Sequence, residues 1–149
     1  MKIYIESSVF NFVLANDAPE KQKITKVFFA NKLAYFEAFV SDIVFSEVGN
    51  TKEPKRSALL EIMAQYPLTN LRNSEEAIKL ARNYVSKKII PEKYLNDALH
   101  IAIAVVNNID VIVSWNLEHI VKLKTIVEVN KINLRNGYKQ IVIVTPEEI

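Results

Sequence analysis

The stretch Lys2-Ile3-Tyr4-Ile5-Glu6-Ser7-Ser8 decides the fold, because an apolar run ends there in an acid and two hydroxyl side chains. The segment Asp110-Val111-Ile112-Val113-Ser114-Trp115-Asn116 repeats this arrangement, with Asn116 close behind the second run. Short apolar runs bounded by polar residues predict buried strands. In open parallel α/β sheets, ligands bind outside the carboxyl ends of the strands. The two segments therefore predict a ligand site to which Glu6 and Asn116 both contribute.

Strand-like and helix-like segments alternate through the rest of the chain. Strands are expected at 35–40, 68–71 and 140–144, and helices at 19–33, after Ser41 or Asp42, from Pro54 to about Tyr66 and after Ser74. Helices between short apolar strands favour a parallel sheet with helices on both faces, which is a three-layer α/β/α architecture. Because the 149 residues contain no linker, repeat or low-complexity stretch, we expect residues 1–149 to form a single domain.

Asp97 lies in the stretch least suited to a charge, since residues 94–106 are apolar almost all the way round a helix. Such a helix is buried, and a buried carboxylate is normally paired or coordinates a metal. The alternative is a first-turn acid placed favourably against the helix dipole. Glu47, on the helix expected after Ser41, is a further oxygen donor beside Glu6 and Asn116. Together the four side chains favour an assembled metal site.

Composition excludes several classes of protein. The chain has no cysteine, which rules out disulfides, zinc–thiolate sites and thiol catalysis. No window reaches the roughly 18 consecutive apolar residues of a membrane span, and Glu6 interrupts the first apolar run. We therefore expect a soluble, cytoplasmic protein with no leader and no membrane partner. The few glycines leave neither a phosphate-binding glycine loop nor a nucleophile elbow.

The formal net charge of +2 is too small to identify a nucleic-acid partner, but basic residues are concentrated between 120 and 141. Glu128 is the single acid there, among Lys122, Lys124, Lys131, Arg135 and Lys139. This segment is suited to following a phosphate backbone, although a solvated helix face is the commoner meaning of a charge run. His100 is expected to be a packed helix residue bonded to a neighbour, and His119 an exposed or helix-end residue.

Four segments of the chain carry a family resemblance. They are Ile3-Tyr4-Ile5-Glu6-Ser7-Ser8-Val9, Ser41-Asp42-Ile43-Val44-Phe45-Ser46-Glu47-Val48, Asn96-Asp97-Ala98-Leu99-His100-Ile101-Ala102 and Val113-Ser114-Trp115-Asn116. In this order they resemble the segments that carry the four site positions of PIN domains. The chain is similar in particular to the toxin ribonucleases of bacterial VapC-type toxin–antitoxin pairs. The aspartate helix and the Ser-Trp-Asn segment are the most specific matches.

The resemblance implies a central sheet of four or five parallel strands, a bound Mg²⁺ or Mn²⁺ ion, and hydrolysis of RNA phosphodiester bonds. The residues that carry catalysis and hold the metal would be Glu6, Glu47, Asp97 and Asn116, with Glu47 acting through water or by orienting the nucleophile. Mg²⁺ prefers oxygen ligands and keeps several waters, which suits this set. Ser8 and Ser114 are expected to hydrogen-bond the ligating carboxylates.

Two positions depart from the commonest family pattern. Aspartate is more usual at the first position, and Glu6 reaches one methylene further. Asparagine at position 116 removes one negative charge, which favours one firmly held ion over two.

The resemblance also implies partners. They are an RNA substrate, a cognate antitoxin that binds through an extended or helical segment, and a second copy of the chain in a homodimer. Six apolar residues are dense enough to include an exposed interface patch, although most of them are expected in the core. They are Phe10, Phe12, Val13, Phe28, Phe29 and Leu33. Two alternatives remain open, namely a non-catalytic PIN-like module that binds RNA or protein, and a structure-specific DNA nuclease. Contacts to the 2′-hydroxyl would separate RNA from DNA.

Overall fold

A five-stranded sheet with the strand order β3-β2-β1-β4-β5 runs through the computed structural model, which describes all 149 residues. Every neighbouring pair of strands is parallel. The strands are β1 (Lys2–Ile5), β2 (Glu37–Ser41), β3 (Leu68–Leu71), β4 (Val111–Val113) and β5 (Val142–Val144). The expected parallel α/β sheet is confirmed, with five strands.

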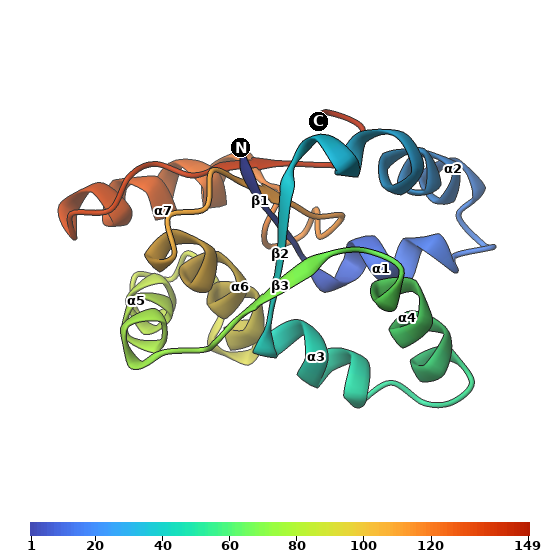
Figure 1. The fold of residues 1–149 in the computed structure, drawn as a ribbon. Coiled ribbons are helices and arrows are strands. Elements are labelled where there is room, and N and C mark those ends of the chain that lie inside the picture. The colour runs from blue at the N-terminus through green and yellow to red at the C-terminus, as the bar shows by residue number, and fades with distance from the viewer.

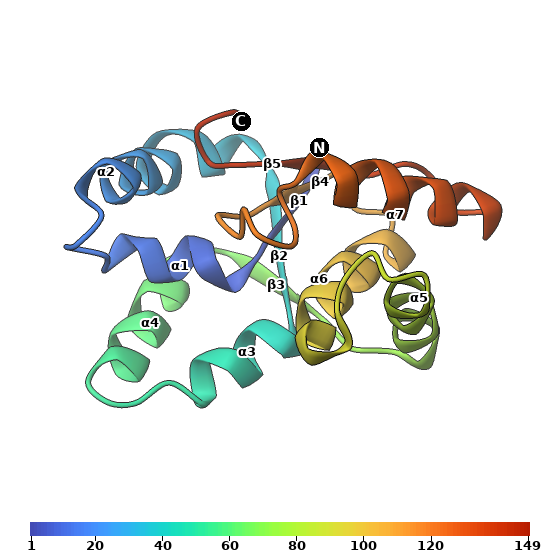
Figure 2. The same ribbon diagram turned by 180° about the vertical axis from the view of Figure 1, so that it is seen from behind.

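Seven α-helices surround the sheet. They are α1 (Ser7–Val13), α2 (Pro19–Val27), α3 (Asp42–Gly49), α4 (Lys55–Ala64), α5 (Glu75–Ser86), α6 (Leu95–Val106) and α7 (Leu123–Arg135). Figure 1 shows α5, α6 and α7 on one side of the sheet and α1, α2 and α4 on the other, and Figure 2 shows the same division from behind. The helix α3 lies at the end of the sheet where β2 finishes. This is the expected three-layer α/β/α arrangement.

Side chains that cap helices set several of the element boundaries. Ser41 Oγ accepts the backbone N–H of Ile43 at 3.2 Å and starts α3, and Ser74 Oγ accepts that of Ala77 at 3.1 Å and starts α5. Such caps are typical of serine, because its hydroxyl satisfies a free N–H in the first turn. Both helix starts are therefore confirmed, with Ser41 rather than Asp42 as the cap of α3.

The helix expected at 19–33 was placed wrongly at its end. The α-helix stops at Val27 and continues as a π-helical turn (Phe28–Lys32) and a 3₁₀ turn (Leu33–Tyr35). These turns bury Phe28, Phe29 and Leu33 against the core while leaving Tyr35 exposed. The strand expected from Tyr35 consequently begins at Glu37. An apolar stripe alone did not distinguish a regular helix from wider and tighter turns.

The helix α6 is buried in the core, which explains why almost all of its residues are apolar. Every residue from Ala98 to Val105 is buried, as its all-round apolar sequence predicted. Phe10, Phe28, Phe29 and Leu33 also belong to the core, and Phe12 and Val13 are half-buried against it. None of the helices is long and apolar enough to cross a membrane.

The basic segment between 120 and 141 forms α7 and the turn after it. Lys131 pairs with Glu128 at 3.1 Å, and Lys139 pairs with Asp110 at 2.7 Å. Both pairs are largely exposed. Two of the five basic residues are thus engaged in surface ion pairs, in keeping with a solvated face.

Candidate metal centre

The register of the sheet brings Glu6 and Ser114 side by side. Ile5 of β1 pairs with Val113 of β4, and the backbone N–H of Glu6 donates to the Val113 carbonyl at 3.1 Å. The residues that follow the two strands therefore leave the sheet together at its carboxyl edge. The Glu6 side chain is buried there, with 5% of the residue exposed.

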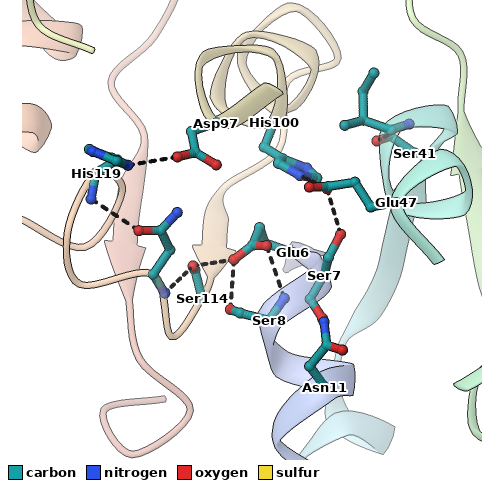
Figure 3. A network of polar contacts seen from close by, with 12 residues as sticks. Glu6, Ser7, Ser8, Asn11, Ser41, Glu47, Asp97, His100, Ser114 and His119 are labelled. Carbon is teal, nitrogen blue, oxygen red and sulfur yellow. Dashed lines mark hydrogen bonds and ion pairs between the residues drawn. The ribbon is translucent and has the colours of Figure 1, made fainter. Parts of the chain in front are cut away.

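Three hydrogen bonds hold the Glu6 carboxylate. Oε1 accepts from Ser8 Oγ at 2.6 Å and from Ser114 Oγ at 2.5 Å, and Oε2 accepts the backbone N–H of Ser8 at 2.9 Å (Figure 3). The last bond makes Glu6 the N-cap of α1. Each serine also accepts a backbone N–H beyond β4, Ser8 that of Trp115 and Ser114 that of Asn116. The two serines thus tie the acid to the loop after β4.

Glu47 projects from α3 toward the same place. Its Oε1 accepts from Ser7 Oγ at 2.8 Å and lies 2.5 Å from His100 Nε2. Burial of Glu47 raises its pKa, but the bonds from His100 and Ser7 and the charge of His100 outweigh that effect and hold the pKa below its usual value. The carboxylate is therefore ionised at neutral pH although it is only about one-third exposed (34% of the side chain).

Asp97 faces the pocket from the first turn of α6. Its Oδ2 lies 2.9 Å from His119 Nδ1, and 15% of its side chain is exposed. Burial raises the pKa of Asp97, and hydrogen bonding with the side chains of Asn116 and His119 offsets only part of that effect. A nearby positive charge stabilises the ionised form of a buried carboxyl group, because the attraction offsets the cost of burying the charge.

Asn116 lies in the loop after β4 and is held at both ends. Its backbone N–H donates to Ser114 Oγ at 2.9 Å, and its Oδ1 accepts the backbone N–H of His119 at 3.0 Å. This second bond closes the turn that carries His119 back toward Asp97. The loop therefore places an amide and an imidazole together beside the carboxylates.

All four site residues expected from the sequence line one pocket of about 290 Å³. Its walls are formed by Glu6, Ser7, Ser8, Asn11, Glu47, Val48, Thr51, Asp97 and Asn116. None of the three carboxylates forms an ion pair with lysine or arginine, and two of them, Glu47 and Asp97, contact a histidine. Carboxylates and an amide oxygen are the donor set that Mg²⁺ and Mn²⁺ prefer, so the residues fit such an ion. Ligand atoms of Glu6, Glu47 and His100 lie within 4.8 Å of one another.

Both histidines contribute to the site more directly than the sequence predicted. His100 is fully buried and packed in α6, as expected, but the neighbour it bonds is Glu47. The expectation that His119 is exposed or at a helix end was wrong, because it lies in a turn with 12% of its side chain exposed and contacts Asp97. The three-residue spacing of Asp97 and His100 places both on one face of α6. No signal in the sequence connected His119 with Asp97.

A buried chain of hydroxyl groups supports His100 from behind. Its Nδ1 lies 2.6 Å from the Tyr4 hydroxyl, which lies 2.7 Å from Ser41 Oγ. All three residues have no exposed surface. Burial raises the pKa of Tyr4 well above its usual value, so the phenol stays neutral and available for hydrogen bonding. The chain leads from the N-cap of α3 to the Glu47 carboxylate on the same helix.

The chain is an α/β protein with a PIN-like fold, and acids gather at the carboxyl edge of its parallel sheet. No protein-family model matches the chain, and no curated protein matches it. Among solved structures, the chain is similar to VapC20 of Mycobacterium tuberculosis, a sarcin-ricin loop cleaving toxin. The TM-score is 0.61 at 12% identity, over 93% of this chain and 98% of that chain.

A second solved structure points the same way. VapBC2 from Rickettsia felis, bound to a DNA fragment from their promoter, aligns with a TM-score of 0.56 and 14% identity, over 97% of this chain and 98% of that chain. At these identities the likeness shows the fold. The chain therefore has the fold of the VapC toxins, as its resemblance to PIN domains implied.

Proposed function

We propose that the protein is a metal-dependent endoribonuclease that hydrolyses RNA phosphodiester bonds and acts as the toxin of a toxin–antitoxin pair. One observation carries this proposal. Glu6, Glu47, Asp97 and Asn116 come from separate parts of the chain and line a single pocket with no lysine or arginine paired to its acids. Gathering three acids costs stability through mutual repulsion and desolvation, and a divalent cation removes that cost.

Each residue of the pocket would have a distinct role. Glu6 and Asp97 would hold a Mg²⁺ or Mn²⁺ ion, and Asn116 would hold one of its waters or a phosphate oxygen through its amide. Such an ion lowers the pKa of an attacking water and neutralises charge on the phosphate. Glu47 would bind through water or orient the nucleophilic water. Ser8 and Ser114 keep the Glu6 carboxylate in place through the bonds described above.

The proposal of RNA as the substrate is supported by the fold rather than by the pocket chemistry. Carboxylates and a divalent cation hydrolyse RNA and DNA phosphodiesters alike, so the proposal of RNA is supported by the likeness to VapC20, a toxin that cleaves the sarcin-ricin loop. A ribosomal RNA stem-loop is accordingly one substrate to test. A DNA nuclease and a non-catalytic binding module are the other outcomes of that test.

The experiment measures cleavage of total cellular RNA, a ribosomal RNA stem-loop and structured DNA by the purified protein. Reactions contain Mg²⁺ or Mn²⁺, with EDTA as the metal-free control. Asp97→Asn removes a pocket charge, and Asp110→Asn is the matched control because Asp110 lies at the opposite end of β4, bonded to Lys2 and Lys139. We expect metal-dependent RNA cleavage by the wild-type protein and by Asp110→Asn, and no cleavage by Asp97→Asn. Cleavage that Asp97→Asn leaves unchanged would refute the site.

We further propose that a cognate antitoxin binds beside the pocket. A larger groove of about 1,030 Å³ runs between α1, α2 and the start of α4, and Asn11 lines both this groove and the acidic pocket. Phe12 and Leu14 give it an apolar floor suited to an extended or helical segment. A segment seated there would reach the acids. Co-purification with the product of an adjacent small reading frame, and loss of RNA cleavage in the complex, test this partner.

A cytoplasmic location and a homodimer belong to the same proposal. Cytoplasmic RNA would be the substrate, and the absence of cysteine suits a reducing compartment. Sedimentation equilibrium of the purified chain measures whether a dimer forms.

A further inference from the structure

Each of two pocket acids is held by a histidine from a different part of the chain. His100 Nε2 lies 2.5 Å from Glu47 Oε1, and His119 Nδ1 lies 2.9 Å from Asp97 Oδ2. Figure 3 shows the His119 imidazole next to Asp97 and the His100 imidazole next to Glu47. The two contacts use opposite ring nitrogens. That difference makes their roles separately testable.

The His100 ring has no freedom to turn. Both of its nitrogens are engaged, Nε2 by Glu47 and Nδ1 by the Tyr4 hydroxyl at 2.6 Å, and the ring has no exposed surface. A carboxylate only accepts hydrogen bonds, so Nε2 carries the hydrogen whatever the charge of the ring. In the neutral ring, the Tyr4 hydroxyl donates to Nδ1 and Ser41 donates to Tyr4, which satisfies every group of the chain.

The His119 ring is fixed in another way. Its backbone N–H donates to Asn116 Oδ1 at 3.0 Å, which sets the turn. The ring packs on the Tyr94 ring with centroids 4.1 Å apart, on the turn that leads into α6. Asp97 lies in the first turn of that helix. The stacked pair therefore fixes the imidazole relative to the acid.

The bonds to Glu47 leave one oxygen open. Both donors, Ser7 Oγ and His100 Nε2, bond Oε1, and Oε2 has no hydrogen bond. A carboxylate held by one oxygen presents the other in a fixed direction, and this arrangement is the usual way in which surrounding groups orient metal ligands.

Building on the proposed function, we propose that His100 and His119 are positioning residues that orient Glu47 and Asp97 toward the divalent cation. They touch neither the cation nor the substrate. A solely structural role would lower the stability of the protein and leave the cation affinity of the folded protein unchanged. Positioning lowers that affinity in protein that remains folded.

The test exploits the two ring nitrogens. A glutamine amide places its N–H₂ near the position of Nε2, and an asparagine amide places its own near Nδ1. His100→Gln and His119→Asn therefore keep the donor to the acid, whereas His100→Asn and His119→Gln remove it. Mn²⁺ affinity is measured from the electron paramagnetic resonance signal of free Mn²⁺, below the melting temperature of every variant. Near-ultraviolet circular dichroism verifies the fold.

We expect His100→Asn and His119→Gln to weaken Mn²⁺ binding about 10- to 100-fold, as is usual for groups that orient metal ligands. The donor-retaining variants should recover most of the affinity. Equal affinities within each pair, or wild-type affinity in all four variants, would overturn the inference. Absence of Mn²⁺ binding by the wild-type protein would instead refute the proposed function. If His100→Asn does not fold, Tyr4→Phe is used in its place. This substitution removes the hydroxyl that contacts His100 Nδ1, so it should also weaken Mn²⁺ binding. An unchanged affinity in Tyr4→Phe would count against the inference.

Discussion

Ser114 Oγ lies 2.5 Å from Glu6 Oε1 and accepts the backbone N–H of Asn116 at 2.9 Å, so a single hydroxyl joins two of the pocket residues. Ser114 has no exposed surface. The geometry follows from the pairing of β1 with β4, which sets the two strand ends beside each other.

Ser114→Ala should lower the free energy of unfolding by about 1–3 kcal/mol, because it leaves a buried carboxylate oxygen and a backbone N–H without that partner. Urea denaturation measures the change. Ser57→Ala is the control, since Ser57 bonds Glu53 on the surface and should shift stability by no more than about 0.5 kcal/mol. Equal effects of the two substitutions would show that the buried bridge contributes no more than a surface hydrogen bond.

Glu6→Asp should reduce metal-dependent cleavage roughly a hundredfold, since a displacement of about 1 Å is enough for such a loss. The shorter side chain cannot reach the present position of Oε1, where Ser8 and Ser114 converge. Steady-state cleavage rates at saturating Mn²⁺ measure the effect. Activity equal to the wild type would mean that Ser8 and Ser114 move with the shorter carboxylate and do not fix its position.

Asp97→Asn should raise the melting temperature of the metal-free protein at pH 7. The folded pKa of Asp97 lies above its usual 3.8, so the folded protein loses stability as the pH rises through that pKa and the group ionises. Asparagine removes this cost, and each kcal/mol gained is worth roughly 2–4 °C in a chain of this size. Asp110→Asn should do the opposite, because bonds from Lys139 and Lys2 hold the pKa of Asp110 below its usual value.

Mn²⁺ should stabilise the wild-type protein, since a ligand at about a hundred times its Kd adds about 2.7 kcal/mol to the free energy of unfolding. The same addition should leave the melting temperature of Asp97→Asn nearly unchanged. Differential scanning calorimetry with and without Mn²⁺ measures both shifts. A shift of the same size in the variant would place the ion elsewhere.

The His100–Glu47 pair should stabilise the fold most between about pH 4.5 and 6.5, the usual pKa values of the two groups. Burial disfavours both charges. For Glu47 the bonds from His100 and Ser7 and the charge of His100 outweigh it. For His100 the bond to Glu47 and the charges of Glu6, Glu47 and Asp97 outweigh it. The pKa of Glu47 is lowered, so its contribution is lost as the pH falls below 4.5 through the folded pKa. The pKa of His100 is raised, so its contribution is lost as the pH rises above 6.5 through the folded pKa.

Urea denaturation from pH 4 to pH 9 measures this dependence. His100→Gln should flatten the decline on the alkaline side, because glutamine does not titrate. A decline of equal size in the variant would assign it to other groups.

Local patterns were enough for most of the architecture. The strand at Leu68–Leu71 and the serine caps at Ser41 and Ser74 follow from neighbouring residues, and so does the burial of α6. The end of α2 at Val27 does not, because the turn after it depends on how Phe28 and Phe29 pack against the core. Local sequence does not encode that packing.

The sequence by itself determined that Glu6 and Asn116 follow apolar strands and that Asp97 lies on an apolar, buried helix, which predicted a shared site at one edge of a parallel sheet. Only the tertiary structure decided how they are held. His100 and Glu47 are 53 residues apart, and His119 and Asp97 are 22 apart. The direction of each side chain depends on the packing of α3, α6 and the loop after β4 against one another. A hydrogen bond of under 3 Å between residues so far apart along the chain depends on that packing. No periodic pattern in the sequence predicts it.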